Sequence, residues 1–406
     1  MKEKKLGVWL IGALGSISTT VIVGALALRK GLTEATGMIT TTEVFSGLAL
    51  VDLDAIVFGG CDIRDRATPD AVRQVLNLAP GLGHSVYAAI EAEFQDIVRG
   101  FSKGTVRNCG DAIQQLAASC PSRDGSLRDE ISEVRKCLQW FRQEHSLDEM
   151  VVVNLASTEP VLEIDDRQQN LAAFEYCLDR NQVEAVRAST IYAYAAVKEG
   201  CPYINFTPSN AALIPAVVEL AESNRVPVMG NDGKTGETLV KSVLAPMFSC
   251  RNLEVLSWEG FNILGNMDGS ILNHPENRES KIRTKDRILA EILGYAPHSR
   301  VHIDYVPSLD DQKTAWDFIH FKGFLGARMS LQFVWQGYDS ILAAPLILDL
   351  VRLAEFAKRR GESGLMPHLA SYFKAPLGVT EHRLYEQYRL LLDYAEQAEQ
   401  RTSKPS

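Results

Sequence analysis

The chain has 406 residues, of which 46% are hydrophobic and 23% charged, as expected for a soluble protein of two domains or one large α/β unit. Its formal net charge of −9 argues against nonspecific nucleic-acid binding, which requires a basic surface. The seven cysteines are scattered, odd in number and lack any C-x-x-C pair. We therefore interpret them as reduced thiols of a cytoplasmic protein rather than as disulfides or a zinc site.

The N-terminal segment can be interpreted in two ways. Three lysines precede an uncharged run from Leu6 to Leu28, which is long enough for a membrane span or a signal peptide. Glycines and hydroxyl-bearing residues interrupt this run in its middle, and no small-residue cleavage site precedes Arg29. We therefore favour a buried strand at Leu6 to Ile11, a glycine turn, and a buried helix from Ser16 to Leu28, with no membrane contact.

The glycine turn reads G-A-L-G-S-I-S, where a dinucleotide-binding fingerprint has G-x-G-x-x-G. Gly12 suits the tight turn, Gly15 allows the backbone to approach a pyrophosphate, and Ser18 stands in the place of the third glycine. The hydroxyls of Ser16 and Thr19 could donate hydrogen bonds to phosphate. Taken alone the motif is weak, and an ordinary strand-to-helix turn is the alternative.

Strand-like and helix-like segments alternate along the first half of the chain. Helical patterns at Glu184 to Lys198 and Ala211 to Glu222 separate apolar runs that we predict to be strands: Ala55 to Phe58, Met150 to Asn154, Tyr203 to Phe206 and Val226 to Met229. Small or polar residues follow each run, and ligands bind at the carboxyl ends of parallel strands. The pattern predicts a cofactor cleft on a Rossmann-type parallel sheet, with a helical insertion from about Gly81 to Leu147.

The most distinctive segment is G-N-D-G-K-T-G-E-T-L-V-K-S, from Gly230 to Ser242. A glycine-rich turn that leads into a helix exposes backbone N–H groups and partial positive charge to an anion. Lys234 and Lys241 would add two full charges. The segment is not a phosphate-binding P-loop, because Val228 stands where that motif needs a glycine. We therefore predict a phosphate or oxyanion site of another kind.

Four further lysines lie beyond this segment, among strand-like runs at Leu253 to Trp258 and Val301 to Val306. Lys281 and Lys285 would share one face of a helix, for which a solvated surface helix is the alternative. Lys313 follows two aspartates. Lys374 has apolar neighbours, so its ammonium either extends outward to water or is held with a depressed pKa.

Together these segments resemble the myo-inositol-1-phosphate synthase family, also called inositol-3-phosphate synthase, from Val8 to about Leu392. The motifs that carry the resemblance follow the family's order and spacing. They are F-G-G-C-D-I-R (58–64), Y-I-N-F-T-P-S-N (203–210), the 230–242 segment, L-G-N-M-D-G (264–269), R-E-S-K-I-R-T-K (278–285), D-D-Q-K (310–313), L-A-A-P-L-I-L-D-L (342–350) and K-A-P-L (374–377).

The resemblance implies a reaction. Members bind glucose 6-phosphate and NAD, oxidise C5, remove a proton from C6, join C6 to C1 by an intramolecular aldol step, and reduce C5 again. Net redox change is zero. Each stage develops negative charge on a sugar oxygen beside a phosphate, which fixed ammonium groups in a dry cleft stabilise.

The resemblance also implies site residues. The catalytic set is Lys234, Lys241, Lys281, Lys285, Asp311, Lys313 and Lys374. Lys281 and Lys374 would hold the C1 and C5 oxygens, whereas Lys234, Lys241 and Lys285 would hold phosphate or the enolate. Asp311 with Lys313 would orient the C5 region. The NAD-binding set is Gly12, Gly15, Ser16, Ile17, Ser18, Thr19, Asp62, Asn154, Ser157, Thr158, Asn210 and Asp232.

The chain resembles the shorter prokaryotic and archaeal branch, since it has Leu239 where eukaryotic-type members have a further lysine. A divalent metal ion such as Mg²⁺ is left open, with Asp232, Asp268, Asp310 and Asp311 as the available carboxylates. The architecture implied is an NAD-binding Rossmann domain at 1–233 completed by 332–406, and an α/β catalytic and tetramerisation domain at 234–331. A homotetramer is expected. A net-redox NAD(P) dehydrogenase acting on a phosphorylated sugar and a non-catalytic relative are the alternatives.

Overall fold

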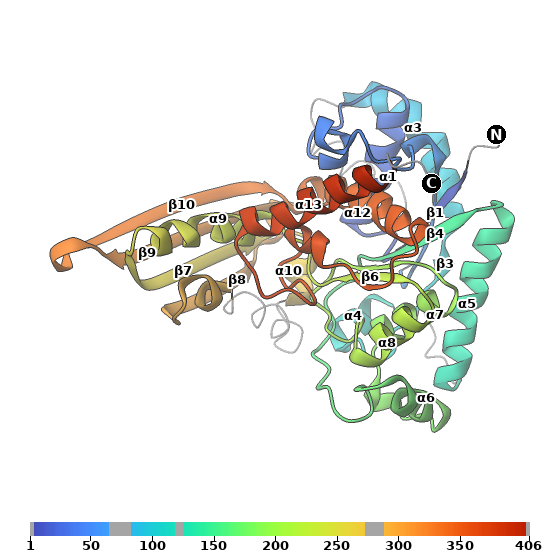
Figure 1. The fold of residues 1–406 in the computed structure, drawn as a ribbon. Coiled ribbons are helices and arrows are strands. Elements are labelled where there is room, and N and C mark those ends of the chain that lie inside the picture. Colours follow the sequence, from blue (N-terminus) through green and yellow to red (C-terminus); the bar gives the residue numbers. More distant parts are fainter. Residues whose placement is uncertain (1–3, 65–82, 118–124, 273–287, 403–406) are drawn as a thin grey trace.

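The computed structural model describes residues 4–64, 83–117, 125–272 and 288–402, which build two β-sheets with helices around them (Figure 1). The larger sheet has seven strands in the order β11-β6-β5-β4-β1-β2-β3, and every pairing in it is parallel. The strands are β1 (Leu6–Ile11), β2 (Ile56–Asp62), β3 (Ser102–Lys103), β4 (Glu149–Asn154), β5 (Tyr203–Asn205), β6 (Pro227–Gly230) and β11 (Gly364–Leu365). The predicted Rossmann-type parallel sheet is confirmed.

The uncharged N-terminal run forms β1 and the helix α1 (Ser16–Arg29), as predicted. All six residues of β1 are buried, because its two neighbours in the sheet and helices on both faces cover it. α1 is buried over most of its length. In the part of the chain that the structure describes, no helix combines the length and apolar character of a membrane span.

Alternation along the strands divides the core into two layers. Leu6, Val8 and Leu10 of β1 face one side, where α1, α3 (Gly83–Arg99), α12 (Asp339–Arg359) and α13 (Leu384–Thr402) pack. Trp9 and Ile11 face the other side, which is covered by α5 (Leu127–Glu144), α6 (Leu171–Asp179), α7 (Ala188–Lys198) and α8 (Pro215–Ser223). The expected insertion between β2 and β4 is helical, comprising α3, α4 (Asp111–Leu116) and α5 with the short β3.

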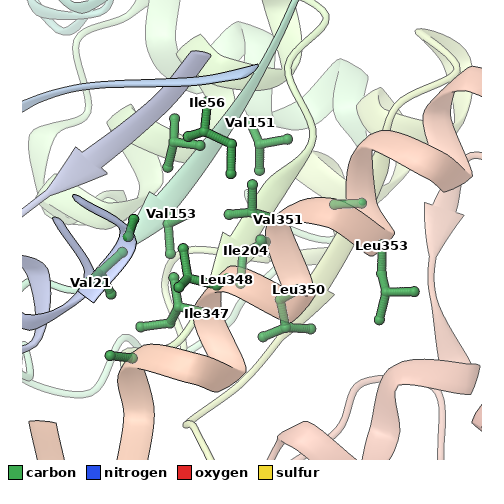
Figure 2. Close-up of a cluster of buried hydrophobic side chains, with 14 of the residues drawn as sticks. Val21, Ile56, Val151, Val153, Ile204, Ile347, Leu348, Leu350, Val351 and Leu353 are labelled. Carbon is green, nitrogen blue, oxygen red and sulfur yellow. The ribbon is translucent and has the colours of Figure 1, made fainter. Parts of the chain in front are cut away.

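α12 is the central helix of the first layer. Figure 2 shows Ile347, Leu348 and Val351 of this helix packed against Val153 of β4 and Ile204 of β5. Asp349 of the same helix accepts hydrogen bonds from the backbone amides of Ile39 and Thr40, and so ties the connection between α1 and β2 to the core. The C-terminal part of the chain therefore completes the first sheet's domain.

The second sheet has four strands in the order β10-β9-β7-β8, with β7 (Glu254–Leu264), β8 (His298–Tyr305), β9 (Gln312–Lys322) and β10 (Arg328–Tyr338). Helix α9 (Gly236–Cys250) covers one face, where Phe248 packs on Trp258 and Ile319. The boundary expected at 331 falls inside β10, because β10 pairs with β9 along its whole length, up to Tyr338. The first domain resumes at α12.

The remaining elements are short. They are the helix α10 (Met267–Leu272) and the 3-10 segments η1 (Ile39–Thr41), η2 (Glu43–Phe45), η3 (Leu53–Ala55), η4 (Val183–Ala185), η5 (Pro307–Leu309), η6 (Phe324–Gly326) and η7 (Pro367–Tyr372). Of these, η7 matters most for the site, since it leads directly to Lys374.

Candidate active site

A cavity of about 420 Å³ lies at the carboxyl ends of the parallel strands. The segments after β1, β2, β4, β5 and β6 line it, and Gly265, Asn266, Tyr305, Asp310 and Asp311 from the second sheet's connections complete the wall. This is the place that an open parallel sheet offers to a ligand. The cavity is therefore shared between the two sheets, as a cofactor and a substrate that react together require.

The first turn is shaped for close backbone approach. Gly12 has a φ of +79°, and a Cβ there would lie 3.0 Å from the backbone of Ala156. Gly15 precedes α1 without a side-chain capping bond, so the first amides of the helix, at Ser16 and Ile17, open toward the cavity. The Ser18 hydroxyl donates to the Gly12 carbonyl at 2.8 Å. This hydrogen bond connects the first turn of α1 back to Gly12.

Most of the residues expected to bind NAD line this cavity: Gly12, Gly15, Ser16, Ile17, Asp62, Asn154, Ser157, Thr158 and Asp232. Ser18, Thr19 and Asn210 do not line it. Asn210 instead holds the loop after β4 in place. Its side-chain amide accepts from the Leu162 N–H at 3.0 Å and donates to the Leu162 carbonyl at 2.7 Å.

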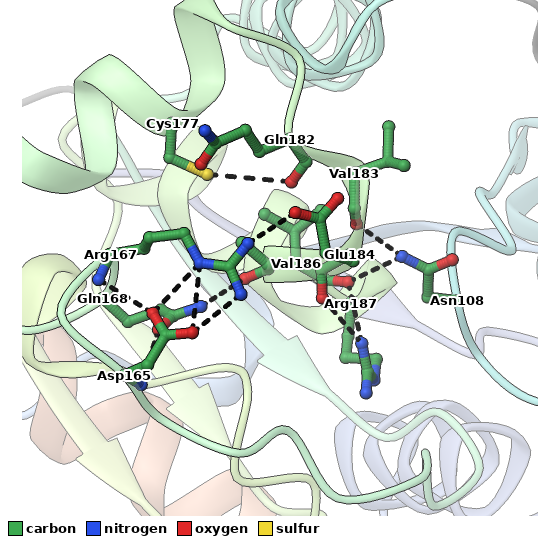
Figure 3. A network of polar contacts seen from close by, with 11 residues as sticks. Asn108, Asp165, Arg167, Gln168, Cys177, Gln182, Val183, Glu184, Val186 and Arg187 are labelled. Atoms are coloured by element: carbon green, nitrogen blue, oxygen red, sulfur yellow. Dashed lines mark hydrogen bonds and ion pairs between the residues drawn. The ribbon is translucent and has the colours of Figure 1, made fainter.

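The loop after β4 and the start of α7 are held by a polar network (Figure 3). Arg167 pairs with Asp165 at 2.7 Å and with Glu184 at 2.5 Å, and Asn108 donates to the carbonyls of Val183 and Val186. These contacts position Ala188 and Ser189, which line the cavity.

Beside this network, Glu159 accepts from the Ser189 N–H at 2.9 Å. Burial raises the pKa of Glu159 to about 7, and the bonds from Ser189 oppose the rise.

The turn after β6 differs from the expectation. Its backbone amides do not face an anion, because neighbouring carbonyls accept all of them, from Asn231 to Thr235. Ala375 accepts from Asn231 at 2.8 Å and Tyr372 accepts from Lys234 at 2.7 Å. The prediction of free turn amides is therefore wrong. The turn instead joins β6 to the C-terminal segment, and the positive charge at this place comes from side chains.

Among the lysines that the structure describes, Lys374 lines the cavity. Its ammonium lies 2.8 Å from Asp232 Oδ1, and both side chains are buried. Lys234 is buried close by and donates to Oε1 of Gln387 in α13. Burial, reinforced by the charge of Lys374, lowers the pKa of Lys234 to about 7. The two amines thus form a buried cationic pair in which one charge is balanced by a carboxylate.

A second polar group occupies the opposite wall. Asp311 accepts from the hydroxyl of Ser340 and from Asn266 Nδ2 at 3.4 Å, and burial raises its pKa. Lys313 lies 3.4 Å from Asp339. Asp311, Asp339 and Ser340 line the cavity, whereas the buried Lys313 lies behind Asp339.

Lys241 lies outside the cavity lining, on the face of α9 that packs against the second sheet. Its ammonium is 2.6 Å from Glu237 and 3.7 Å from Asp317, and it lies 5.8 Å from the ring centre of Trp258. The Trp258 indole donates to Asp317 at 2.6 Å. All four side chains are buried. In this structure the lysine joins α9 to the second sheet through Asp317, and its expected role as a ligand of phosphate or the enolate stays a prediction.

Lys281 and Lys285 lie outside the described residues, as does the side chain of Asp268. Within the described ranges, no group of three or more His, Cys, Asp or Glu residues could hold a metal ion. The residues that were missed include Arg64, Asn266 and Asp339, which line the cavity, and Gln387, which accepts from Lys234. Two of them stand inside motifs already quoted, F-G-G-C-D-I-R and L-G-N-M-D-G. Asp339 follows a strand that was not predicted, and Gln387 comes from a distant helix.

A protein-family model described as myo-inositol-1-phosphate synthase matches residues 6–395. The chain belongs to this family. Inositol-3-phosphate synthase 1 of Bacteroides thetaiotaomicron is 33% identical over 414 residues, covering 95% of this chain and 94% of that protein. Isozyme 1 of Arabidopsis thaliana is 30% identical, covering 88% of this chain and 76% of that protein.

Solved structures agree with this membership. The inositol-3-phosphate synthase of Caenorhabditis elegans has the same fold, with a TM-score of 0.86 over 98% of this chain and 86% of that one at 24% identity. A myo-inositol-1-phosphate synthase-related protein of Thermotoga maritima has a TM-score of 0.76 over 97% of this chain and 98% of that one at 27% identity. The model that matches is that of an NAD-binding family, and Gly12 and Gly15 of the glycine turn line the cavity.

Replacement of Lys241 tests its structural role. Lys241→Met should lower the free energy of unfolding by about 3–5 kcal/mol, because Glu237 and Asp317 would remain buried without their counter-charge. Lys322→Met, which breaks an exposed pair with Glu254 on the same sheet, should cost about 0–1 kcal/mol. Urea unfolding measures both. Equal midpoints for Lys241→Met and the wild type would contradict the assignment.

The lowered pKa of Lys234 has a consequence for stability. Between about pH 7 and the ordinary value of 10.5, the unfolded chain holds a proton on Lys234 that the folded chain has released. The contribution of Lys234 to stability therefore rises with pH across this window. The unfolding free energy of the wild type minus that of Lys234→Met should rise by an amount on the order of a few kcal/mol from about pH 7 to about pH 10. A difference that stays constant with pH would refute the assignment.

Proposed function

We propose that this chain converts D-glucose 6-phosphate to 1D-myo-inositol 3-phosphate with NAD held in the cavity. The observation that carries the proposal is the buried Lys374–Asp232 pair in the wall of a cavity that also contains the glycine turn. Family membership supports the same reaction. Oxidation at C5, enolisation, ring closure between C6 and C1, and reduction at C5 leave the redox balance unchanged.

The residues around the glycine turn fit NAD. Gly12 leaves a space that a Cβ would fill, and the open end of α1 at Gly15 and Ser16 suits a pyrophosphate. Asn154, Ser157 and Thr158 would extend the binding surface along the cavity. When bound there, NAD supplies reversible hydride acceptance at C5.

The lysines supply charge where the sugar develops it. Lys374 would stabilise the oxyanion at C5, because its ammonium is fixed by Asp232 and excluded from bulk water. Lys234 would hold the substrate phosphate. A phosphate beside Lys234 favours its charged form, so binding would offset the burial that lowers its pKa. Asp311, held by Ser340, would orient the C5 region together with Lys313. Lys281 and Lys285 remain part of the proposed catalytic set.

The proposal predicts a specific product balance. Purified protein incubated with glucose 6-phosphate and NAD should form inositol phosphate, detected by phosphorus NMR, without accumulation of NADH. Lys374→Ala should slow the reaction by about 10²-fold or more, whereas the exposed Lys322→Ala should retain wild-type rate. Parallel reactions with and without EDTA test for a divalent metal ion.

Each rival function has its own outcome in this assay. Stoichiometric NADH together with an oxidised sugar phosphate would indicate a net-redox dehydrogenase. Absence of any product, with the protein folded and NAD bound, would indicate a non-catalytic relative.

The described cysteines are all free thiols, which supports a reducing compartment such as the cytoplasm.

We infer further that a second copy of the chain covers the open face of the second sheet. Phe261, His302 and Trp316 stack across β7, β8 and β9, with ring centres 4.4 Å and 5.1 Å apart. Val334 of β10 pairs with Trp316 and is 62% exposed. Side chains of α9 cover the other face of the sheet. A flat, aromatic sheet face is suited to self-association, and the homotetramer expected for the family would use it.

The oligomer can be tested by mass. The wild type should have the molar mass of a tetramer in light scattering after gel filtration, and Val334→Glu should lower that mass, because charge would then be buried at the interface. Val44→Glu, at an exposed residue far from this sheet in the sequence, is the control. A monomeric wild type would rule out the inferred interface.

A further inference from the structure

An aspartate and an arginine share the carboxyl end of β2 at the edge of the cavity. Asp62 is the last residue of β2 and is 5% exposed, whereas the Arg64 side chain is 32% exposed. Both line the cavity. In a Rossmann unit an acidic residue at this end accepts from the adenosine ribose 2′-hydroxyl, and an arginine nearby accommodates a 2′-phosphate. This chain carries both types of residue at one place.

The acceptor capacity of Asp62 is already used. Its Oδ1 accepts from the Arg64 backbone N–H at 2.9 Å and from Arg64 Nε at 3.1 Å. Its Oδ2 accepts from the Leu14 N–H at 2.8 Å and from Arg64 Nη2 at 3.2 Å. A carboxylate offers about four acceptor positions, so these four bonds fill them. A ribose hydroxyl could donate to Asp62 only after one of these bonds broke.

Arg64, by contrast, retains donors. A guanidinium has five N–H donors, and the bonds to Asp62 use one on Nε and one on Nη2, which leaves three among the contacts of the described residues. Its planar fork matches the geometry of phosphate oxygens. The pair with Asp62 is neutral overall, which offsets the repulsion that a lone carboxylate would exert on a phosphate.

The glycine turn fixes the position of this pair. The bond from Leu14 to Asp62 comes from the residue just before Gly15, and the amides of Gly12 and Ala13 both donate to the Cys61 carbonyl, at 2.9 Å and 3.0 Å. Asp62 and Arg64 are therefore held at a constant distance from the pyrophosphate position. The guanidinium is also the more exposed of the two groups, at 32% against 5% for the carboxylate, and is therefore the more accessible to a group that extends from the adenosine ribose.

We propose that this end of the cavity accepts a 2′-phosphate, so that the chain binds NADP as well as NAD, with Arg64 as the residue that recognises the phosphate. The inference rests on the proposed NAD-dependent function. It adds a specificity determinant to that function and assigns Asp62 the task of orienting Arg64.

Equilibrium binding of NAD and NADP to the full-length protein, measured by titration calorimetry, tests the proposal. The wild type should bind NADP with a Kd within about tenfold of its Kd for NAD. Arg64→Ala should raise the ratio of the NADP Kd to the NAD Kd by at least about tenfold, because only NADP presents a phosphate to the guanidinium. Arg64→Lys should give an intermediate ratio, since it keeps the charge and loses the fork.

Arg99→Ala, which removes an exposed arginine that pairs with Asp96, is the matched control and should leave the ratio unchanged. Circular dichroism establishes that each variant is folded. Binding of NAD with a wild-type NADP Kd at least about 100-fold weaker, or an unchanged ratio in Arg64→Ala and Arg64→Lys, would overturn this inference alone. Failure to bind either cofactor would overturn the proposed function as well.

Discussion

The site depends on one backbone junction between three distant segments. The amides of residues 231–234 donate to carbonyls at 206–207, 372 and 375, and the amides of Lys374 and Ala375 return bonds to the carbonyls of Asp232 and Asn231. These bonds place a lysine from the C-terminal part of the chain against an aspartate that follows β6. Without them, Lys374 and Asp232 would be two separate residues, 142 positions apart in the sequence. With them, they are a buried ion pair in the cavity wall.

The same junction explains why the two sheets share a cavity. α9 begins immediately after the turn and runs along the second sheet, where the buried Lys241 pairs with Glu237 of the same helix and with Asp317 of β9. α12 begins immediately after β10 and returns the chain to the first sheet. Both connections leave the side chains that we propose to be catalytic little freedom to move apart. A reaction that forms charge on one sugar oxygen after another benefits from such a rigid arrangement, because the ammonium groups need no reorganisation.

Three lysines of the predicted catalytic set have different physical environments. Lys374 faces the cavity, Lys234 lies behind it with a lowered pKa, and Lys241 stabilises a helix from beneath. A buried ammonium whose charge is balanced by two carboxylates is a poor ligand for phosphate, since the substrate would have to compete with those partners. The sequence could not distinguish these cases, because Lys234 lies in the glycine turn and Lys241 in the helix that follows it directly. The partner carboxylate Asp317 comes from β9, far along the chain.

Much of the first domain followed from local pattern. The buried strand at Leu6 to Ile11, the glycine turn and the helix after it were predictable because apolar runs, glycines and polar strand ends are local signals of a parallel sheet. The contacts of Lys374, Lys241 and Gln387 were not predictable, because each depends on a partner more than 70 residues away in the sequence. β9 and β10 escaped prediction for a related reason. Their side chains alternate between a face covered by α9 and an open face that carries aromatic residues, so hydrophobicity did not mark them as strands. Residue types and their order therefore established the fold class and indicated the chemistry, and long-range packing assigned Lys234, Lys241 and Lys374 their places.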